Sequence, residues 1–573
     1  MRRDLLILIS LLALLFGFNL GRRALWSPAE GRYAEIPRAM VVSGDYLTPR
    51  LNGVKYFEKP PLFYWLQALA IKLFGLNEWS LRSWTALFAL LGCIVVYAAG
   101  RELFGRRTGW IASLILASSP LYYAMARVIT TDMALSFFIS AALLAFLAAT
   151  RRAPGRSRRL LMWAFFICTA LATLTKGLIG AVLPALVIGA WIAFLGEWKI
   201  FRAMYLPSGL FFYAAIAAPW HVLVSRANPE FARFYFIHEH FQRYLGADQR
   251  PLQQAWAYIP VLLIGFFPWA AFVIQAFRNN LGFSWEHRRK HQGQLFLGLW
   301  AVLIVVFFSA SGSQLFTYIL PAFPPLALLI GETFSAWWAA EAAPGIRPGV
   351  WAVAIALLLL VAAGLGAPQH RLERYSNWPS SNTPSDDTTI PSTRLTSYPD
   401  LEKLAPYIYA QAAVLLCGAI AVFSVRRRGL SRIFPVLATT SALFLIVMDS
   451  GFPLLDDRRS VKTLALALKP ALGPADEVAT YRTYYQDLPV YLERRVTVVE
   501  WRGELAFGAE VEDTSAWMID DATFWRRWSG AAAMYAVTDR ENYDQLVANG
   551  RPVHLLMKSP YNVVVTNHPR VIR

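Results

Sequence analysis

Stretches of about 20 apolar residues recur along the whole chain, and one such stretch is what a helix needs to cross the apolar core of a bilayer. The composition agrees, since 56% of the 573 residues are hydrophobic, only 16% are charged and the mean hydropathy is +0.40. The sequence therefore predicts a polytopic α-helical membrane protein. Using about 20 residues per crossing, we expect about 13 spans, near residues 5–20, 84–100, 109–126, 133–150, 160–175, 178–195, 204–222, 255–277, 294–309, 319–336, 349–366, 406–424 and 433–449.

The basic residues are concentrated in alternate short connections between these spans. They include Arg106-Arg107, Arg151-Arg152, Arg202, Arg288-Arg289 and Arg426-Arg427. The positive-inside rule assigns such connections, and with them the N-terminus, to the cytoplasm. An odd number of spans then leaves the C-terminus outside. Because this placement accounts for the net charge of +18, we expect membrane lipids but no nucleic acid as partners.

The connections on the other side are longer and more polar. Residues 1–449 form the predicted membrane domain, with a first loop at 21–83 and a flexible, lid-like loop at 367–405 that is rich in Ser, Thr, Pro and Asn. Residues 450–573 have the composition of a soluble domain. Strand patterns at 477–482, 495–501, 534–539 and 562–567 alternate there with helical patterns at 457–469, 520–529 and 540–549. This alternation predicts a C-terminal α/β domain with a partly parallel sheet, which serves as a scaffold or a lid.

The three cysteines, Cys93, Cys168 and Cys417, all lie inside apolar stretches. They offer the polar parts of the chain neither a disulfide framework nor a thiolate metal site. We expect them to be small buried apolar side chains.

Charged and phenolic side chains are dense in the first loop. Glu30 and Tyr33 would lie along one side of a helix, with Arg32 and Glu35 on another. We expect this helix to lie in the membrane interface. In the following string Lys55-Tyr56-Phe57-Glu58-Lys59-Pro60-Pro61, two prolines stiffen the backbone beside opposite charges. Such stiffness suits a binding site, although an interfacial anchor is the competing interpretation.

Four polar residues in the other outer connections each have an ordinary explanation. Asp132 can be the N-terminal cap of a span, Lys176 can reach the interface by extending its side chain, His240 can simply be solvated, and Tyr318 can belong to the aromatic belt. Together with the first loop, however, they bring acids, cations and phenols to one membrane face from at least four connections. This convergence favours an active site.

Several strings resemble bacterial lipid-linked glycosyltransferases of the GT-C class, and more narrowly the aminoarabinose transferases that modify lipid A, which are relatives of protein O-mannosyltransferases. The more specific strings are Arg32-Tyr33-Ala34-Glu35 and Tyr56-Phe57-Glu58-Lys59-Pro60. Weaker matches are Ser43-Gly44-Asp45-Tyr46, Thr131-Asp132, Thr175-Lys176-Gly177, Glu239-His240 with Arg243, and Thr317-Tyr318-Ile319-Leu320-Pro321. The resemblance covers residues 5 to about 335, and the family layout also includes a C-terminal outer domain.

The resemblance implies an inverting transfer of 4-amino-4-deoxy-L-arabinose from undecaprenyl phosphate to a phosphate of lipid A or a similar anionic glycolipid. Transfer would occur at the periplasmic face of the inner membrane. It implies catalytic roles for Glu30, Lys59 and Asp132, and a possible divalent metal, zinc, on Glu58 and His240. The implied contacts to the donor phosphate or lipid come from Arg32, Tyr33, Tyr56, Lys59, Lys176, Arg243 and Tyr318.

The chain departs from the family at two places. Ala29 stands where the family usually has an aspartate, so that Glu30 or Asp132 is left for the acid or base role. The turn Ser311–Gln314 has none of the usual lysines, which removes positive charge near a phosphate-rich acceptor. Transfer to a protein, a polysaccharide or another lipid therefore remains an alternative. A transporter or flippase would need polar groups near the membrane midplane, whereas these lie at span ends.

Overall fold

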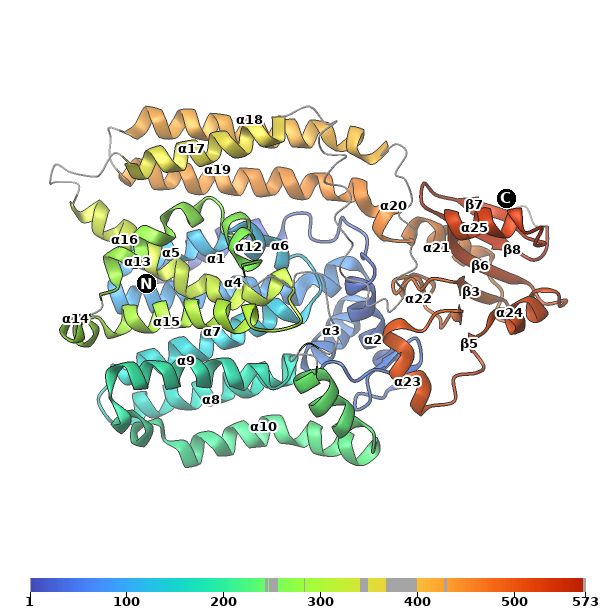
Figure 1. Ribbon diagram of the computed structural model, residues 1–573, viewed down its shortest axis with the longest axis horizontal. Helices are drawn as coiled ribbons and strands as arrows, with labels where there is room; N and C mark the ends of the chain where they lie inside the picture. The colour runs from blue at the N-terminus through green and yellow to red at the C-terminus, as the bar shows by residue number, and fades with distance from the viewer. Residues whose placement is uncertain are drawn as a thin grey trace.

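The computed structural model describes residues 2–242, 246, 256–282, 284–340, 349–366, 399–426 and 430–569. A long helical bundle carries an α/β domain at one end, and we call this end of the bundle the covered end (Figure 1). The N-terminus and α14 (Trp285–Lys290), which holds the basic run at 288–290, lie toward the opposite end. The predicted loop at 367–405 falls largely outside the described residues.

The bundle is built from helices whose apolar sequences explain their packing in a membrane. They are α1 (Arg2–Gly17), α4 (Glu78–Phe104), α5 (Arg106–Ala117), α6 (Pro120–Met125), α7 (Thr131–Thr150), α8 (Arg156–Lys176), α9 (Ile179–Leu195), α10 (Leu206–Ala227), α12 (Tyr258–Gly265), α13 (Val273–Asn280), α15 (Gln292–Ser309), α16 (Phe323–Ala339), α17 (Gly349–Gly366), α18 (Pro399–Val425) and α19 (Leu430–Gly451). Shorter helical segments are η1 (Trp198–Met204), η2 (Arg233–Gln242), η3 (Trp269–Phe272) and η4 (Phe316–Ala322).

The predicted count of 13 spans is not confirmed. Within the described residues, eight helices are long and apolar enough to cross a membrane, or nine if one bent pair is a single span. The expected span at 255–277 is this pair, which bends by 110° around Pro268. The expected span at 109–126 is split into α5 and α6 at Pro120. Proline lacks an amide hydrogen and disfavours helix in the residue before it. Apolar length alone therefore predicted one continuous helix in each of these two segments, where the structure has a break.

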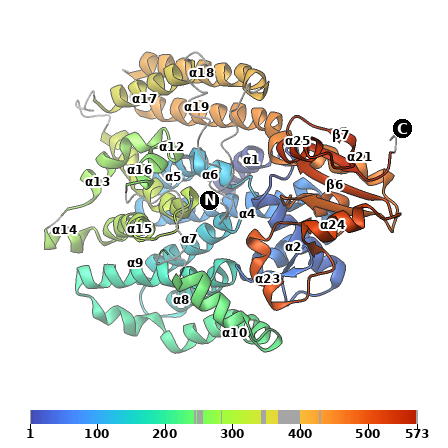
Figure 2. The same cartoon turned by 45° about the vertical axis from the view of Figure 1, so that its right-hand side comes forward.

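The first loop contains α2 (Ala29–Ser43), a two-stranded hairpin of β1 (Arg50–Leu51) and β2 (Val54–Lys55), and α3 (Leu62–Phe74). Figures 1 and 2 place α2 between the bundle and the C-terminal domain. Its two predicted faces are confirmed, because Glu30 points to the bundle and Arg32 to the C-terminal domain. That this helix lies in the membrane interface stays a prediction. The C-terminal domain covers it, and nine of its 15 residues are buried.

The C-terminal domain is an α/β fold with a six-stranded sheet in the order β5-β4-β3-β6-β8-β7. The strands β5, β4, β3 and β6 are parallel, and β8 and β7 continue the sheet as antiparallel strands, which confirms the predicted partly parallel sheet. The strands are β3 (Glu477–Tyr481), β4 (Thr497–Val499), β5 (Met518–Ile519), β6 (Met534–Asp539), β7 (His554–Lys558) and β8 (Asn562–Thr566). The helical elements are η8 (Phe452–Leu455), α20 (Asp456–Arg459), α21 (Lys462–Leu468), η9 (Lys469–Ala471), α22 (Leu488–Leu492), η10 (Gly503–Leu505), α23 (Ala506–Val511), α24 (Asp521–Trp528) and α25 (Arg540–Ala548).

Helices α8 and α9 approach each other closely at a glycine. A Cβ atom added to Gly180 would lie 2.4 Å from backbone atoms of Ala172 and Thr173. Small residues allow such backbone contact between membrane helices. The contact fixes the end of α8 that carries Lys176.

We predict that Gly180→Ala lowers the thermal unfolding midpoint of the detergent-purified protein, because overpacking of this kind costs about 1–3 kcal/mol. Gly189→Ala is the matched control in the same helix, since a Cβ there would meet no heavy atom within 4 Å among the described residues beyond its chain neighbours and its own helix backbone. Alanine favours helix over glycine by about 1 kcal/mol, so this variant should unfold at the same or a higher temperature. Equal midpoints for the two variants would contradict the close approach.

Candidate active site at the covered end of the bundle

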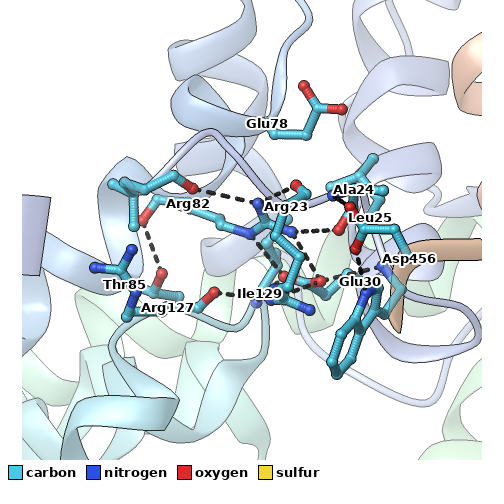
Figure 3. Close-up of polar contacts among 12 residues, drawn as sticks. Arg23, Ala24, Leu25, Glu30, Glu78, Arg82, Thr85, Arg127, Ile129 and Asp456 are labelled. Carbon is cyan, nitrogen blue, oxygen red and sulfur yellow. Dashed lines mark hydrogen bonds and ion pairs between the residues drawn. The ribbon is translucent and has the colours of Figure 1, made fainter. Parts of the chain in front are cut away.

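Glu30, one of the predicted catalytic carboxylates, lies in a buried network of charges (Figure 3). Both of its oxygens accept hydrogen bonds from Arg82, at 2.9 Å each, and one oxygen lies 2.9 Å from Arg23. The backbone amides of Trp26 and Ile129 donate to the same carboxylate at 3.1 and 3.2 Å. Its acceptor sites are thus occupied by protein donors, which assigns Glu30 a structural role and argues against the predicted catalytic one.

The charges around Glu30 keep it ionised. Burial alone raises the pKa of a carboxyl group, but Arg23 and Arg82 outweigh burial and hold the pKa of Glu30 below its ordinary value. Burial also lowers the pKa of Arg23 to about 10, against the attraction of Glu30. The network joins the first loop to the start of α4 and to the turn before α7.

A second group of residues surrounds Lys176, and we call it the Lys176 cluster. Lys176 ends α8 and forms an ion pair with Asp132 in the first turn of α7. Its ammonium nitrogen also lies 4.4 Å from the centroid of the Tyr318 ring, a cation–π contact. The predicted residues Asp132, Lys176 and Tyr318 therefore come together from three separate elements.

A third group, the Arg32 cluster, joins the first loop to the C-terminal domain. Arg32 donates to the Tyr56 hydroxyl at 3.0 Å, lies 3.9 Å from Glu58 and forms an ion pair with Glu504. Lys59 donates to the Glu58 carbonyl oxygen at 2.8 Å. Burial raises the pKa of Tyr56 well above its ordinary value, so that its hydroxyl keeps a proton to donate.

Tyr33 interacts with residues of both clusters. Its hydroxyl interacts electrostatically with Arg32, Lys176 and Asp132. Its ring stacks on Tyr64, with centroids 5.9 Å apart. Two predicted phosphate-binding cations, Arg32 and Lys176, thus interact with Tyr33, and Lys59 is linked to Arg32 through Glu58, which lies 3.9 Å from each.

The remaining predicted site residues are Lys59, which has a further contact, and Arg243 and His240, which lie at the limit of the described residues. Lys59 also lies 3.3 Å from Glu239. Arg243 and the side chain of His240 lie outside the described residues, so the predicted zinc pair of Glu58 and His240 stays a prediction. No group of three or more potential metal ligands from His, Cys, Asp and Glu occurs within the described residues.

Sequence reasoning missed three residues of these networks. Arg82 lies one turn inside a long apolar helix, and a charge in such a position is a signal that could have identified it. Arg23 and Glu504 gave no comparable signal, because charges in a loop or a soluble domain are usually solvated. Only the fold brings them to Glu30 and Arg32.

Three family models match separate parts of the chain. Residues 1–235 match the family model of dolichyl-phosphate-mannose-protein mannosyltransferase, residues 464–567 match the aminoarabinose transferase C-terminal domain, and residues 268–463 match a family of unknown function.

Among curated relatives, an undecaprenyl phosphate-alpha-4-amino-4-deoxy-L-arabinose arabinosyl transferase of Pectobacterium atrosepticum is 29% identical over 94% of this chain and 93% of its own length. An undecaprenyl phosphate-alpha-4-amino-4-deoxy-L-arabinose arabinosyl transferase 2 of Pseudomonas fluorescens is 32% identical over 57% of this chain and 59% of its own length. The crystal structure of ArnT from Cupriavidus metallidurans bound to undecaprenyl phosphate aligns with a TM-score of 0.84 at 30% identity, covering 98% of both chains.

The helical bundle, the polar site at its end and the covering α/β domain define a membrane glycosyltransferase of the GT-C class. Within that class, the chain belongs to the aminoarabinose transferase family.

We predict that Glu30→Gln destabilises the protein by about 3–5 kcal/mol at pH 7, because it leaves two buried arginines without their anion. The pKa of Glu30 is lowered on folding, so its stabilisation is present above the unfolded value of 4.5 and disappears as the pH falls through the folded value. The unfolding midpoints of wild type and variant should therefore converge at acidic pH. Glu102→Gln, which breaks an exposed pair with Arg152, should cost less than about 1 kcal/mol. A pH-independent difference for Glu30→Gln would contradict this account.

Proposed function

We propose that the protein transfers 4-amino-4-deoxy-L-arabinose from undecaprenyl phosphate to a phosphate group of lipid A. The observation that carries this proposal is the set of three cations at the covered end of the bundle: Arg32 and Lys176 interact with Tyr33, and Lys59 shares Glu58 with Arg32. Cations and phenols at the end of a membrane domain suit a lipid whose phosphate lies at the bilayer surface. The named substrates of the relatives agree with this chemistry.

The proposed location is the bacterial inner membrane, with the covered end facing the periplasm. The basic run in α14 lies toward the other end, and the positive-inside rule places such a run in the cytoplasm. The N-terminus would then be cytoplasmic, and the C-terminal domain periplasmic.

In the proposed reaction, an oxygen of the acceptor phosphate attacks the anomeric carbon of the sugar, which inverts. The bond from that carbon to undecaprenyl phosphate breaks, and undecaprenyl phosphate leaves with the electron pair. Arg32, Lys59 and the protonated Tyr56 would bind the departing phosphate and stabilise its developing charge. Contacts of this kind are stronger in a partly desolvated site than in water.

The second pKa of an acceptor phosphate is about 6, so the phosphate is largely ionised at neutral pH. It therefore needs no general base to remove a proton before it attacks the sugar. The site therefore does not need the aspartate that the family usually has at the position of Ala29. Asp132 would then serve by orienting Lys176, its ion-pair partner. Zinc on Glu58 and His240 stays part of the proposal, although no step above requires a metal.

The proposal is tested by mass spectrometry of lipid A extracted from cells with and without the gene. We expect an added aminoarabinose mass that disappears without the gene and with Lys59→Ala, because this variant removes a cation from the departing phosphate. Lys72→Ala, an exposed lysine of the same loop, is the matched control and should leave the modification intact. Unchanged lipid A together with aminoarabinose on a protein, a polysaccharide or another lipid would contradict the proposed acceptor.

Asp132→Asn tests whether the reaction needs a base. A general base typically contributes about 10²–10⁴-fold, so an orienting role predicts a fall in transfer rate of less than about 100-fold. The measurement is the initial rate with purified protein, undecaprenyl phosphate-linked sugar and lipid A. A larger loss, with normal folding and donor binding, would assign Asp132 as the base.

A further inference from the structure

A short segment of the C-terminal domain lies along the first loop, and we call residues 503–512 the strap. It consists of η10, α23 and Glu512. A Cβ added to Gly508 would lie 2.3 Å from the Val54 side chain and 2.4 Å from the Lys55 carbonyl oxygen. The strap therefore packs directly against the β1–β2 hairpin. Figure 2 shows α23 beside the first loop.

Further contacts of the strap continue on both sides of Gly508. The Phe507 ring stacks on Phe234, with centroids 3.7 Å apart, and meets Phe57 edge-on at 6.3 Å. Glu512 accepts hydrogen bonds from both terminal nitrogens of Arg50, at 2.9 and 3.0 Å. The strap thus holds the chain immediately before Glu58 and Lys59.

Glu504 extends from the strap into the Arg32 cluster. Its side chain is only 1% exposed and forms an ion pair with Arg32. Its other oxygen accepts a hydrogen bond of 2.8 Å from the Gln486 amide. Isolated buried carboxylates are costly, so a carboxylate kept at this position needs both partners.

The Arg32 guanidinium is consequently held at two ends by two parts of the chain. One terminal nitrogen pairs with Glu504 of the C-terminal domain, and the other donates to Tyr56 of the first loop. The buried Nε of Arg32 has no hydrogen-bond partner among the described residues. A guanidinium fixed in this way keeps that donor for an oxygen of a phosphate.

Attachment of the C-terminal domain does not require this ion pair. The Asn52 amide already exchanges two 2.9 Å hydrogen bonds with the Val496 backbone, and the Ser27 hydroxyl donates to Asp487 at 2.6 Å. The contact between Glu504 and Arg32 therefore has a more specific use than joining the two domains.

We infer that Glu504 is a positioning residue of the donor site, which orients Arg32 toward the phosphate of the polyprenyl donor. The C-terminal domain is then a part of the transferase site, in addition to covering it. This inference rests on the proposed function, in which Arg32 binds that phosphate.

The test is Glu504→Gln, which keeps the size of the side chain and its contact with Gln486 but removes the charge. A loosened Arg32 weakens contact with the donor phosphate both when the donor binds and when the phosphate departs, so we expect the KM for undecaprenyl phosphate-linked sugar to rise about 10-fold and kcat to fall by no more than about 10-fold. Glu510→Gln, an exposed glutamate of the strap, is the matched control and should keep the wild-type KM. An unchanged KM in Glu504→Gln would overturn the inference.

A double-mutant cycle separates positioning from general destabilisation. If Glu504 acts through Arg32, then Glu504→Gln should have little further effect on KM in an Arg32→Lys background. The same 10-fold rise in that background would overturn the inference.

Titration of the purified variants with undecaprenyl phosphate alone keeps this test independent of the acceptor. Weaker binding by Glu504→Gln supports the inference even if lipid A is not the acceptor. Wild-type affinity in this variant overturns it even if lipid A is modified.

Discussion

The ion pairs of Glu30 with Arg23 and Arg82 determine how the first loop lies against the bundle. Arg82 also donates to the backbone oxygens of Leu20, Arg23 and Ala24, so one guanidinium organises the whole turn before α2. A buried charge without such partners would cost several kcal/mol. The network therefore tolerates few other arrangements, and the position of α2 follows from it.

Once α2 is fixed, its helical geometry distributes its side chains between two surroundings. With 3.6 residues per turn, Glu30 and Tyr33 share the side toward the bundle, while Arg32 and Glu35 share the side toward the C-terminal domain. Tyr33 thereby reaches Lys176 and Asp132, and Arg32 reaches Glu504. The part of the site formed by the bundle and the part formed by the C-terminal domain meet on a single helix of 15 residues.

Much of this architecture could be predicted from the sequence because hydropathy and alternation are local signals. The apolar helices, the strands β3, β6 and β8 and the two faces of α2 follow from such patterns. The bends at Pro120 and Pro268 were missed because apolar length was counted without weighing proline. The part played by Glu504 could not be predicted, since it depends on a contact across 472 residues, the separation of positions 504 and 32.

The glycine that follows Glu30 limits how this protein can be recombined with its relatives. A Cβ at Gly31 would lie 2.5 Å from the backbone nitrogen of Asp487, so the helix and the C-terminal domain touch along bare main chain. Main-chain contact leaves no side chain to adapt when one surface changes shape. A chimera that grafts a foreign C-terminal domain onto this bundle would therefore have to bring its own first loop with it, and the two segments should be inherited as a single unit.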